Sequence, residues 1–299
     1  MGKRMLNKIV VPLDGSTTAE SVIPYIKDLA PRFGSHVDII GVGMGGRGRR
    51  VNCLLDDYIH SVTDDLRSTG IEGEAVLLFG SPADKILDYA TQNDVDLIIM
   101  ATHGRGGITR WWMGSVAEKI VSGALTPVLI TRGKHRKKTE AVQTLSFAKI
   151  LIPLDGSDIG QAALTYAETL AEEIGASISL LQVISPPGAI EASVLGGSDW
   201  RRFVKAMHDA AEDYLNGIAE QLSKRGIETT CEVLSGDPAD VIIEYAESNG
   251  ISLIAMSTHG RTGLARWMIG SVTDKVLHGA SIPMWLVRSP KMIIPVPKS

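Results

Sequence analysis

The stretch that decides the fold is KIVVPLDGS at residues 8–16, which returns as KILIPLDGS at residues 149–157. Each copy is a short, β-branched apolar run that ends near a proline and is followed by an aspartate, Asp14 in the first copy and Asp155 in the second. Such a run predicts a buried strand that stops at a polar Gly-Ser turn. Its recurrence predicts that the chain contains two copies of one structural unit.

Two motifs farther along the chain repeat as well. THGR at residues 102–105 returns at 258–261, and GSV at residues 114–116 returns at 270–272. The second copy is longer between its first motif and these later ones, which indicates an insertion in the middle of that copy. A polar, basic stretch without an apolar face separates the copies and predicts a linker. The predicted organisation is domain 1 at residues 1–132, the linker at 133–146 and domain 2 at 147–299.

Short β-branched runs alternate with helical patterns in both copies, which is typical of βαβ units and a mostly parallel sheet. We predict an α/β fold of two tandem Rossmann-like domains, each an open, mostly parallel five-stranded sheet with helices on both faces. The expected strands are 8–13, 37–42, 74–79, 97–101 and 128–131 in the first copy and 149–154, 177–183, 230–234, 253–256 and 284–287 in the second. Two helix starts are well marked, because Ser81 and Asp237 are capping residues that directly precede a proline.

The composition excludes several classes of protein. Of 299 residues, 44% are hydrophobic and 21% are charged, which is too apolar for intrinsic disorder, and the net charge of −4 gives no basic field for nucleic acid. The apolar runs are far shorter than the roughly 20 residues of a membrane helix, and no export signal is visible. We therefore expect a soluble, cytoplasmic protein without nucleic-acid or membrane partners. Cys53 and Cys231 are widely separated and are expected to be inert packing residues.

The residues with chemical potential follow the predicted strands. In an open parallel sheet, ligands bind beyond the carboxyl ends of the strands. Asp14 and Asp155 follow the first strands, and the segments 104–115 and 260–271 follow the fourth strands and end in Gly-Ser at a predicted helix start. Such a loop can offer backbone N–H groups to phosphate, although it lacks the Gly-Lys-Ser or Gly-Lys-Thr of a Walker loop. An equal alternative is that the glycines only shape turns and Ser115 only caps its helix.

With these motifs the sequence resembles the universal stress protein family, in its tandem form, over nearly its whole length. The nucleotide-binding branch of that family carries Gly-x-x-Gly, nine further residues, and then Gly-Ser or Gly-Thr. Gly104 with Gly114-Ser115 matches this pattern in the first copy, and Gly260 with Gly270-Ser271 matches it in the second. The first glycine of the pattern is replaced by two other small residues, Ala101 and Ser257.

The resemblance implies an ATP site in one or both copies, with a divalent ion such as Mg²⁺ at the phosphates. It places Asp14 and Asp155 at the ribose, the backbones of Val42 and Val183 at the adenine, and Arg105 and Arg261 at the phosphates. The residues expected to bind the nucleotide are Pro12, Leu13, Asp14, Val42, Ala101, Gly104, Arg105, Gly114, Ser115, Val116, Pro153, Leu154, Asp155, Val183, Ser257, Gly260, Arg261, Gly270, Ser271 and Val272. The alternative for the two aspartates is that each caps its own Gly-Ser turn.

The function implied is a stress-response protein whose signalling depends on bound adenine nucleotide. Its two domains would pack as an internal pseudo-dimer through their final strands, with a homodimer of whole chains as a further hypothesis and no protein partner identified. One alternative is a slow ATPase or nucleotide hydrolase, although neither a general base nor a Walker lysine is evident. His103 and His259 recur without a partner at a recognisable spacing, so we expect them to be structural. The other alternative is a nucleotide-free, chaperone-like scaffold.

Overall fold

The computed structural model describes residues 6–43, 49–102, 113–132, 147–185, 197–259 and 269–289. The chain divides into two compact units, and the first of them is made mainly of residues up to Ser146. This first unit also includes Pro283–Arg288 from the second copy of the repeat. The second unit is made mainly of residues from Phe147 to Arg266 together with Gly270–Ile282. The predicted linker at 133–146 lies outside the described residues, so the predicted domain limits stay a prediction.

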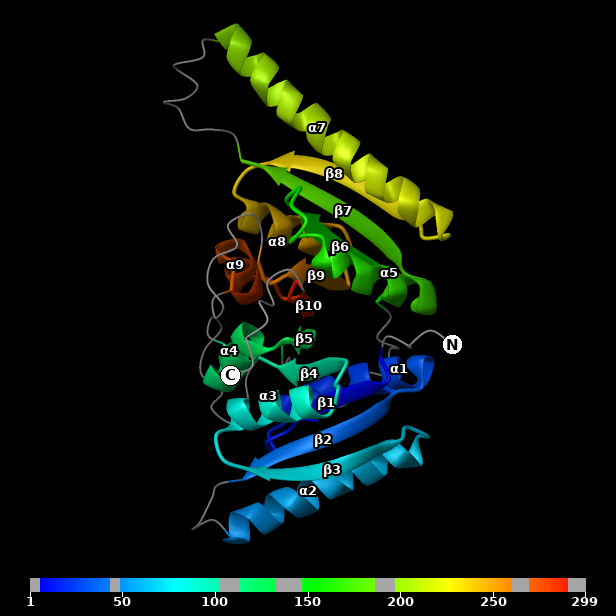
Figure 1. Ribbon diagram of the computed structural model, residues 1–299, viewed down its shortest axis with the longest axis vertical. Coiled ribbons are helices and arrows are strands. Elements are labelled where there is room, and N and C mark those ends of the chain that lie inside the picture. Colours follow the sequence, from blue (N-terminus) through cyan, green and yellow to red (C-terminus); the bar gives the residue numbers. More distant parts are fainter. Residues whose placement is uncertain are drawn as a thin grey trace, which may run out of the picture. The chain divides into compact units, whose positions relative to one another are not determined.

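The first unit is a parallel sheet in the order β3-β2-β1-β4-β5 (Figure 1). Its strands are β1 (Lys8–Pro12), β2 (His36–Gly43), β3 (Gly73–Phe79), β4 (Leu97–Ala101) and β5 (Val128–Thr131). Its helices are the short 3₁₀ helix η1 (Ala19–Val22), α1 (Ile23–Phe33), α2 (Arg49–Ser68), α3 (Pro82–Gln92) and α4 (Ser115–Gly123). A strand from the second copy, β10 (Met284–Val287), pairs antiparallel with β5 inside this unit, with Trp285 opposite Leu129.

The second unit repeats this arrangement, with parallel strands in the order β9-β6-β7-β8. Its strands are β6 (Lys149–Leu154), β7 (Ser177–Ile184), β8 (Thr229–Ser235) and β9 (Leu253–Ser257). Its helices are α5 (Ala162–Ile174), α7 (Gly197–Lys224), α8 (Pro238–Ser248) and α9 (Ser271–Gly279). Helix α7 has 28 residues where its counterpart α2 has 20, so part of the predicted insertion extends this helix.

The strand order follows from the apolar runs that predicted the strands. Ile9, Val10 and Val11 have no solvent exposure, because β1 lies between β2 and β4 and is covered on both faces. The chain moves from β1 to β3 in one direction along the sheet and then returns through β4 to β5. Right-handed crossovers therefore place α1 and α2 on one face and α3 and α4 on the other. This confirms the predicted α/β fold with mostly parallel sheets and helices on both faces.

The two marked helix starts are confirmed, since α3 begins at Pro82 after Ser81 and α8 begins at Pro238 after Asp237. The expectation for Cys53 is wrong, because this residue lies on the exposed side of α2 and is not a packing residue. Cys231, which follows the start of β8, is half-buried. Among the helices that the structure describes, none combines the length and the apolar composition needed to cross a membrane.

Candidate functional site

The carboxyl ends of β1, β2 and β4 lie next to one another in the first unit, because these three strands are neighbours in the sheet. Leu13 continues the pairing beyond β1, since its N–H donates to the carbonyl of Ile40 at 2.9 Å. Asp14 therefore follows directly at the edge of the sheet, half-buried. In the second unit Asp155 has the same position after β6. This is the edge at which open parallel sheets bind ligands.

Each aspartate also organises its own turn. Oδ1 of Asp14 accepts a hydrogen bond from the N–H of Ser16 at 3.0 Å, and Oδ1 of Asp155 accepts from the N–H of Ser157 at 3.0 Å. Between them the glycine has a φ of 79° in both repeats, a conformation that disfavours any side chain. The turn-capping alternative for these aspartates is therefore observed. A role at a ribose stays a proposal, which this turn supports by holding each carboxylate in one orientation.

Backbone hydrogen bonds place the amino end of a helix at the end of the fourth strand. The N–H of Gly114 donates to the carbonyl of Thr102 at 2.8 Å, and the N–H of Gly270 donates to the carbonyl of Thr258 at 2.7 Å. In the second unit the hydroxyl of Thr273 also donates to the carbonyl of Ser257, at 2.9 Å. The chain thus returns to the edge of the sheet before α4 and α9 begin.

The first turns of α4 and α9 have the features of an anion site. Their capping residues are Gly114 and Gly270, which have no side chain to accept from the first N–H groups of the helix. These groups have no acceptor within the helix and carry its partial positive charge. Ser115 and Ser271 begin the helices and are exposed, which leaves their hydroxyls accessible. Both glycines have negative φ values, so their backbone conformation does not itself require glycine.

Other predicted residues are described at the same edges. Pro12 and Pro153 are half-buried, whereas Leu13, Leu154, Ala101 and Ser257 are buried. Val42 is half-buried in β2. It lies two residues beyond Ile40, the last residue of β2 that pairs with β1. Val183 is equally half-buried, one residue past the last pairing partner of β6. Val116 and Val272 are half-buried in the first turns of α4 and α9.

Part of the predicted site lies outside the described residues, namely Gly104, Arg105, Gly260, Arg261 and His103. His259 is described and is 4% exposed. Its Nδ1 lies 3.0 Å from the hydroxyl of Thr258, the residue whose carbonyl accepts from Gly270. Burial beside this backbone connection agrees with the structural role expected for His259.

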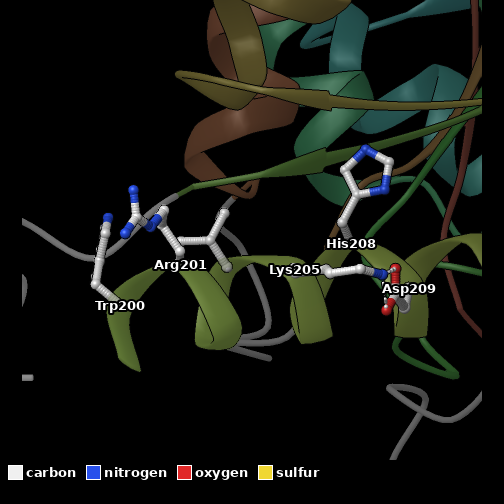
Figure 2. Close-up of a pocket in the computed structure, with 6 residues that line it drawn as sticks. Trp200, Arg201, Lys205, His208 and Asp209 are labelled. Carbon is white, nitrogen blue, oxygen red and sulfur yellow. Dashed lines mark hydrogen bonds and ion pairs between the residues drawn. The ribbon is translucent and has the colours of Figure 1, made fainter. Parts of the chain in front are cut away.

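A separate surface depression of about 470 Å³ lies on α7, lined by Trp200, Arg201, Val204, Lys205, His208 and Asp209 (Figure 2). Lys205 is engaged with Asp209, with Nζ at 2.7 Å from Oδ2, and Figure 2 shows His208 directed away from this pair. All the lining residues belong to one helix, whereas binding sites gather polar groups from several elements. This depression is therefore not assigned as the site.

Together, these observations define a tandem α/β protein whose two repeats have equivalent strand ends and helix starts. A model described as the universal stress protein family matches residues 52–132 and 146–288. The chain belongs to the universal stress protein family. The resemblance to this family, which the sequence carries at Gly104 with Gly114-Ser115 and at Gly260 with Gly270-Ser271, is thus confirmed.

Similar proteins cover either one repeat or both. A universal stress protein of Methanocaldococcus jannaschii is 31% identical over 145 residues, which is 48% of this chain and 84% of that protein. One of Synechocystis is 24% identical over 318 aligned positions, covering 95% of this chain and 100% of that protein. The crystal structure of a universal stress protein from Archaeoglobus fulgidus aligns with a TM-score of 0.72 and 19% identity, over 96% of this chain and 98% of that one. At this identity the structural likeness supports the fold.

Proposed function

We propose that this chain binds ATP in one or both repeats and acts in the stress response as a module whose signalling depends on nucleotide occupancy. The observation that carries the proposal is the hydrogen bond from Gly114 to Thr102, repeated from Gly270 to Thr258. It fixes a helix start without a side-chain cap beside the carboxyl ends of the strands, where the helix dipole favours phosphate.

The proposed contacts divide the nucleotide among three parts of each edge. Phosphates would lie at Gly114, Ser115 and Val116, and at Gly270, Ser271 and Val272 in the second repeat. The ribose would face Asp14 or Asp155, and the adenine edge would pair with the backbone of Val42 or Val183. Pro12, Leu13, Pro153 and Leu154 would line the floor of the sites, with Ala101 and Ser257 close by.

The residues present fit this ligand in two respects. The exposed hydroxyls of Ser115 and Ser271 can donate to phosphate oxygens, and the glycine before each of them adds no side chain at the helix start.

One feature of each helix start opposes an anion. A carboxylate in the first turn, Glu118 in α4 or Asp274 in α9, lies at the same positive end of the helix. A bound Mg²⁺ would neutralise part of the phosphate charge, and such ions are held mainly by phosphate oxygens and water.

Calorimetry on the purified chain tests the proposal directly. Any nucleotide that co-purifies is first identified after acid extraction, and the nucleotide-free protein is then titrated with ATP and Mg²⁺. About two ATP per chain would support a site in each repeat, and about one would assign the site to a single repeat. No binding at millimolar ATP would contradict the proposal and favour the nucleotide-free scaffold.

Two variants locate the binding. Gly114→Glu and Gly270→Glu add bulk and negative charge at the helix starts, so each should abolish binding in its own repeat. Gly217→Glu is the matched control, because Gly217 is exposed on α7 and an added Cβ would meet no atom within 4 Å. Unchanged affinity in the double variant would remove the proposed site. Phosphate release measured on the same proteins separates ATP binding from the alternative of a slow ATPase.

A further inference from the structure

A second group of polar residues lies at the opposite, amino ends of the strands in the first unit. His36 and Asp38 are two positions apart on β2, so their side chains lie on the same face of the sheet. Glu74 on β3 is the direct register partner of Asp38. A nitrogen of His36 and one carboxylate oxygen each from Asp38 and Glu74 all lie within 4.8 Å of one another.

Asp38 is the unusual member, because it has no solvent exposure in an otherwise apolar strand. Its Oδ2 accepts a hydrogen bond from the hydroxyl of Tyr89 at 2.8 Å and lies 3.0 Å from Nζ of Lys8. These two contacts fix the orientation of the buried carboxylate.

The other carboxylate oxygen is held differently. Oδ1 of Asp38 is buried and has no hydrogen-bond partner among the described residues, although Nε2 of His36 lies 3.0 Å away. A tetrahedral divalent metal such as Zn²⁺ holds nitrogen and oxygen ligands at about 2.0–2.2 Å, which places neighbouring ligand atoms about 3.3–3.6 Å apart. Nε2 and Oδ1, now at the distance of an ion pair, therefore need to separate by only a few tenths of an ångström to bind one ion.

The second repeat shows that the fold does not require these charged groups. The counterparts of His36, Asp38 and Glu74 are Ser177, Ser179 and Thr230 at the equivalent register positions. There, the hydroxyls of Ser179 and Tyr245 lie 2.9 Å apart, and the hydroxyl of Thr230 donates to Ser179 at 3.1 Å. A neutral hydrogen-bonded network is sufficient at this place, so the charged set is an addition specific to the first repeat.

We propose that His36, Asp38 and Glu74 bind a first-row divalent metal ion such as Zn²⁺, which joins β2 to β3. An imidazole and two carboxylates suit such an ion better than Mg²⁺ or Ca²⁺, which prefer oxygen ligands alone. The side chain of His36 is 37% exposed, which gives the ion a route from solvent. Lys8 and Tyr89 act as outer partners that hold Oδ2 of Asp38 and leave Oδ1 for the metal.

Calorimetric titration of the chelator-treated, nucleotide-free chain with Zn²⁺ tests this proposal. We expect one tight site per chain, which His36→Ser and Glu74→Thr each weaken by at least about tenfold. Both variants introduce the residue found at the same position of the second repeat. His60→Ser is the matched control, because His60 is an exposed histidine on α2 beside the carboxylate of Asp56. X-ray absorption of the zinc complex should show one imidazole among oxygen ligands.

The possible outcomes separate this site from its alternatives. Equal zinc affinity in wild type, His36→Ser and Glu74→Thr would overturn the proposal, as would the absence of a tight site in wild type. Either result would leave Asp38 as a buried carboxylate held by its contacts with Lys8, Tyr89 and His36. Circular dichroism checks the folding of each variant, and Glu74→Thr alone decides the matter if His36→Ser does not fold, because Glu74 is exposed. Zinc binding retained in the Gly114→Glu, Gly270→Glu double variant would show that the two sites are independent.

Discussion

The two repeats place chemically different polar groups at the amino ends of their second and third strands. In the first repeat a buried carboxylate, Asp38, contacts Tyr89, Lys8 and His36. In the second repeat the equivalent positions carry the hydroxyls of Ser179, Thr230 and Tyr245. Lys149, the counterpart of Lys8, donates instead to the carbonyl of Asn249. The tyrosine and the lysine are thus common to both repeats, whereas the buried carboxylate is not, so the fold does not depend on that carboxylate.

The largest expected difference between the repeats follows from removing the shared tyrosine hydroxyl. Tyr89→Phe leaves a buried carboxylate without one of its donors, which should lower the free energy of unfolding by about 2 kcal/mol. Tyr245→Phe removes a contact between neutral hydroxyls and should lower it by about 1 kcal/mol or less, since Ser179 keeps Thr230. Urea unfolding of both variants measures the difference, and equal losses would contradict the distinction between a charged and a neutral set of polar groups.

A second difference lies in the last strand of each repeat, and here a substitution is expected to raise the free energy of unfolding instead of lowering it. Thr131 in β5 is 1% exposed, and its hydroxyl has no hydrogen-bond partner among the described residues. The equivalent residue of β10 is Val287. Thr131→Val should raise the free energy of unfolding by about 1 kcal/mol, because a buried hydroxyl without a partner is unfavourable.

The reverse change, Val287→Thr, is the control for this prediction. It buries a hydroxyl in a strand where valine is 1% exposed, so it should lower stability. Thermal unfolding of the two variants against wild type gives both values. A Thr131→Val protein that is less stable than wild type would mean that its hydroxyl has an acceptor in solution.

The smallest expected difference is a dependence on pH at two equivalent helix starts. Asp237 accepts hydrogen bonds from the N–H groups of Ala239 and Asp240 at the start of α8, whereas Ser81 makes no side-chain cap at α3. The hydrogen bond from Asp240, followed by that from Lys275, lowers the pKa of Asp237. Because the folded-state pKa is depressed, this contribution is present above the unfolded pKa and is lost as the pH falls through the folded pKa.

Unfolding measured for Asp237→Ser and wild type at several pH values tests this. The variant should have a lower free energy of unfolding than wild type at pH 7. This difference should disappear in acid, below the usual pKa range of an aspartate. Ser81→Ala should show no comparable dependence on pH. A gap for Asp237→Ser that stays constant into acid would show that the cap does not depend on the charge of the carboxylate.

Much of the fold could be predicted from the sequence, because its signals are local. Runs such as Leu97–Ala101 and Lys149–Leu154 predicted strands with the observed limits, since an uninterrupted apolar run suits a strand covered on both faces. The repeated motif at residues 8–16 and 149–157 also indicated the carboxyl edge of each sheet. At that edge the sequence left two interpretations of Asp14 open, a ribose contact and a turn cap, and the structure shows the turn cap.

The cluster around Asp38 was not predicted, although one signal was available. An aspartate between Val37 and Ile39, inside an apolar strand, is rare unless its charge is paired. Its partners, however, are distant in sequence, since Lys8 is on β1 and Tyr89 is on α3. Only the register of β1, β2 and β3 brings these groups together, and register cannot be deduced from a single strand.

The antiparallel pairing of β10 with β5 has a consequence for how the chain is made. The strand that covers the edge of the first unit follows the other strands and helices of the second repeat in the chain, so a ribosome must synthesise all of them before that edge is covered. Until then β5 exposes unpaired backbone groups that another nascent chain could pair with. A protein shortened before Met284 would carry that exposed strand permanently.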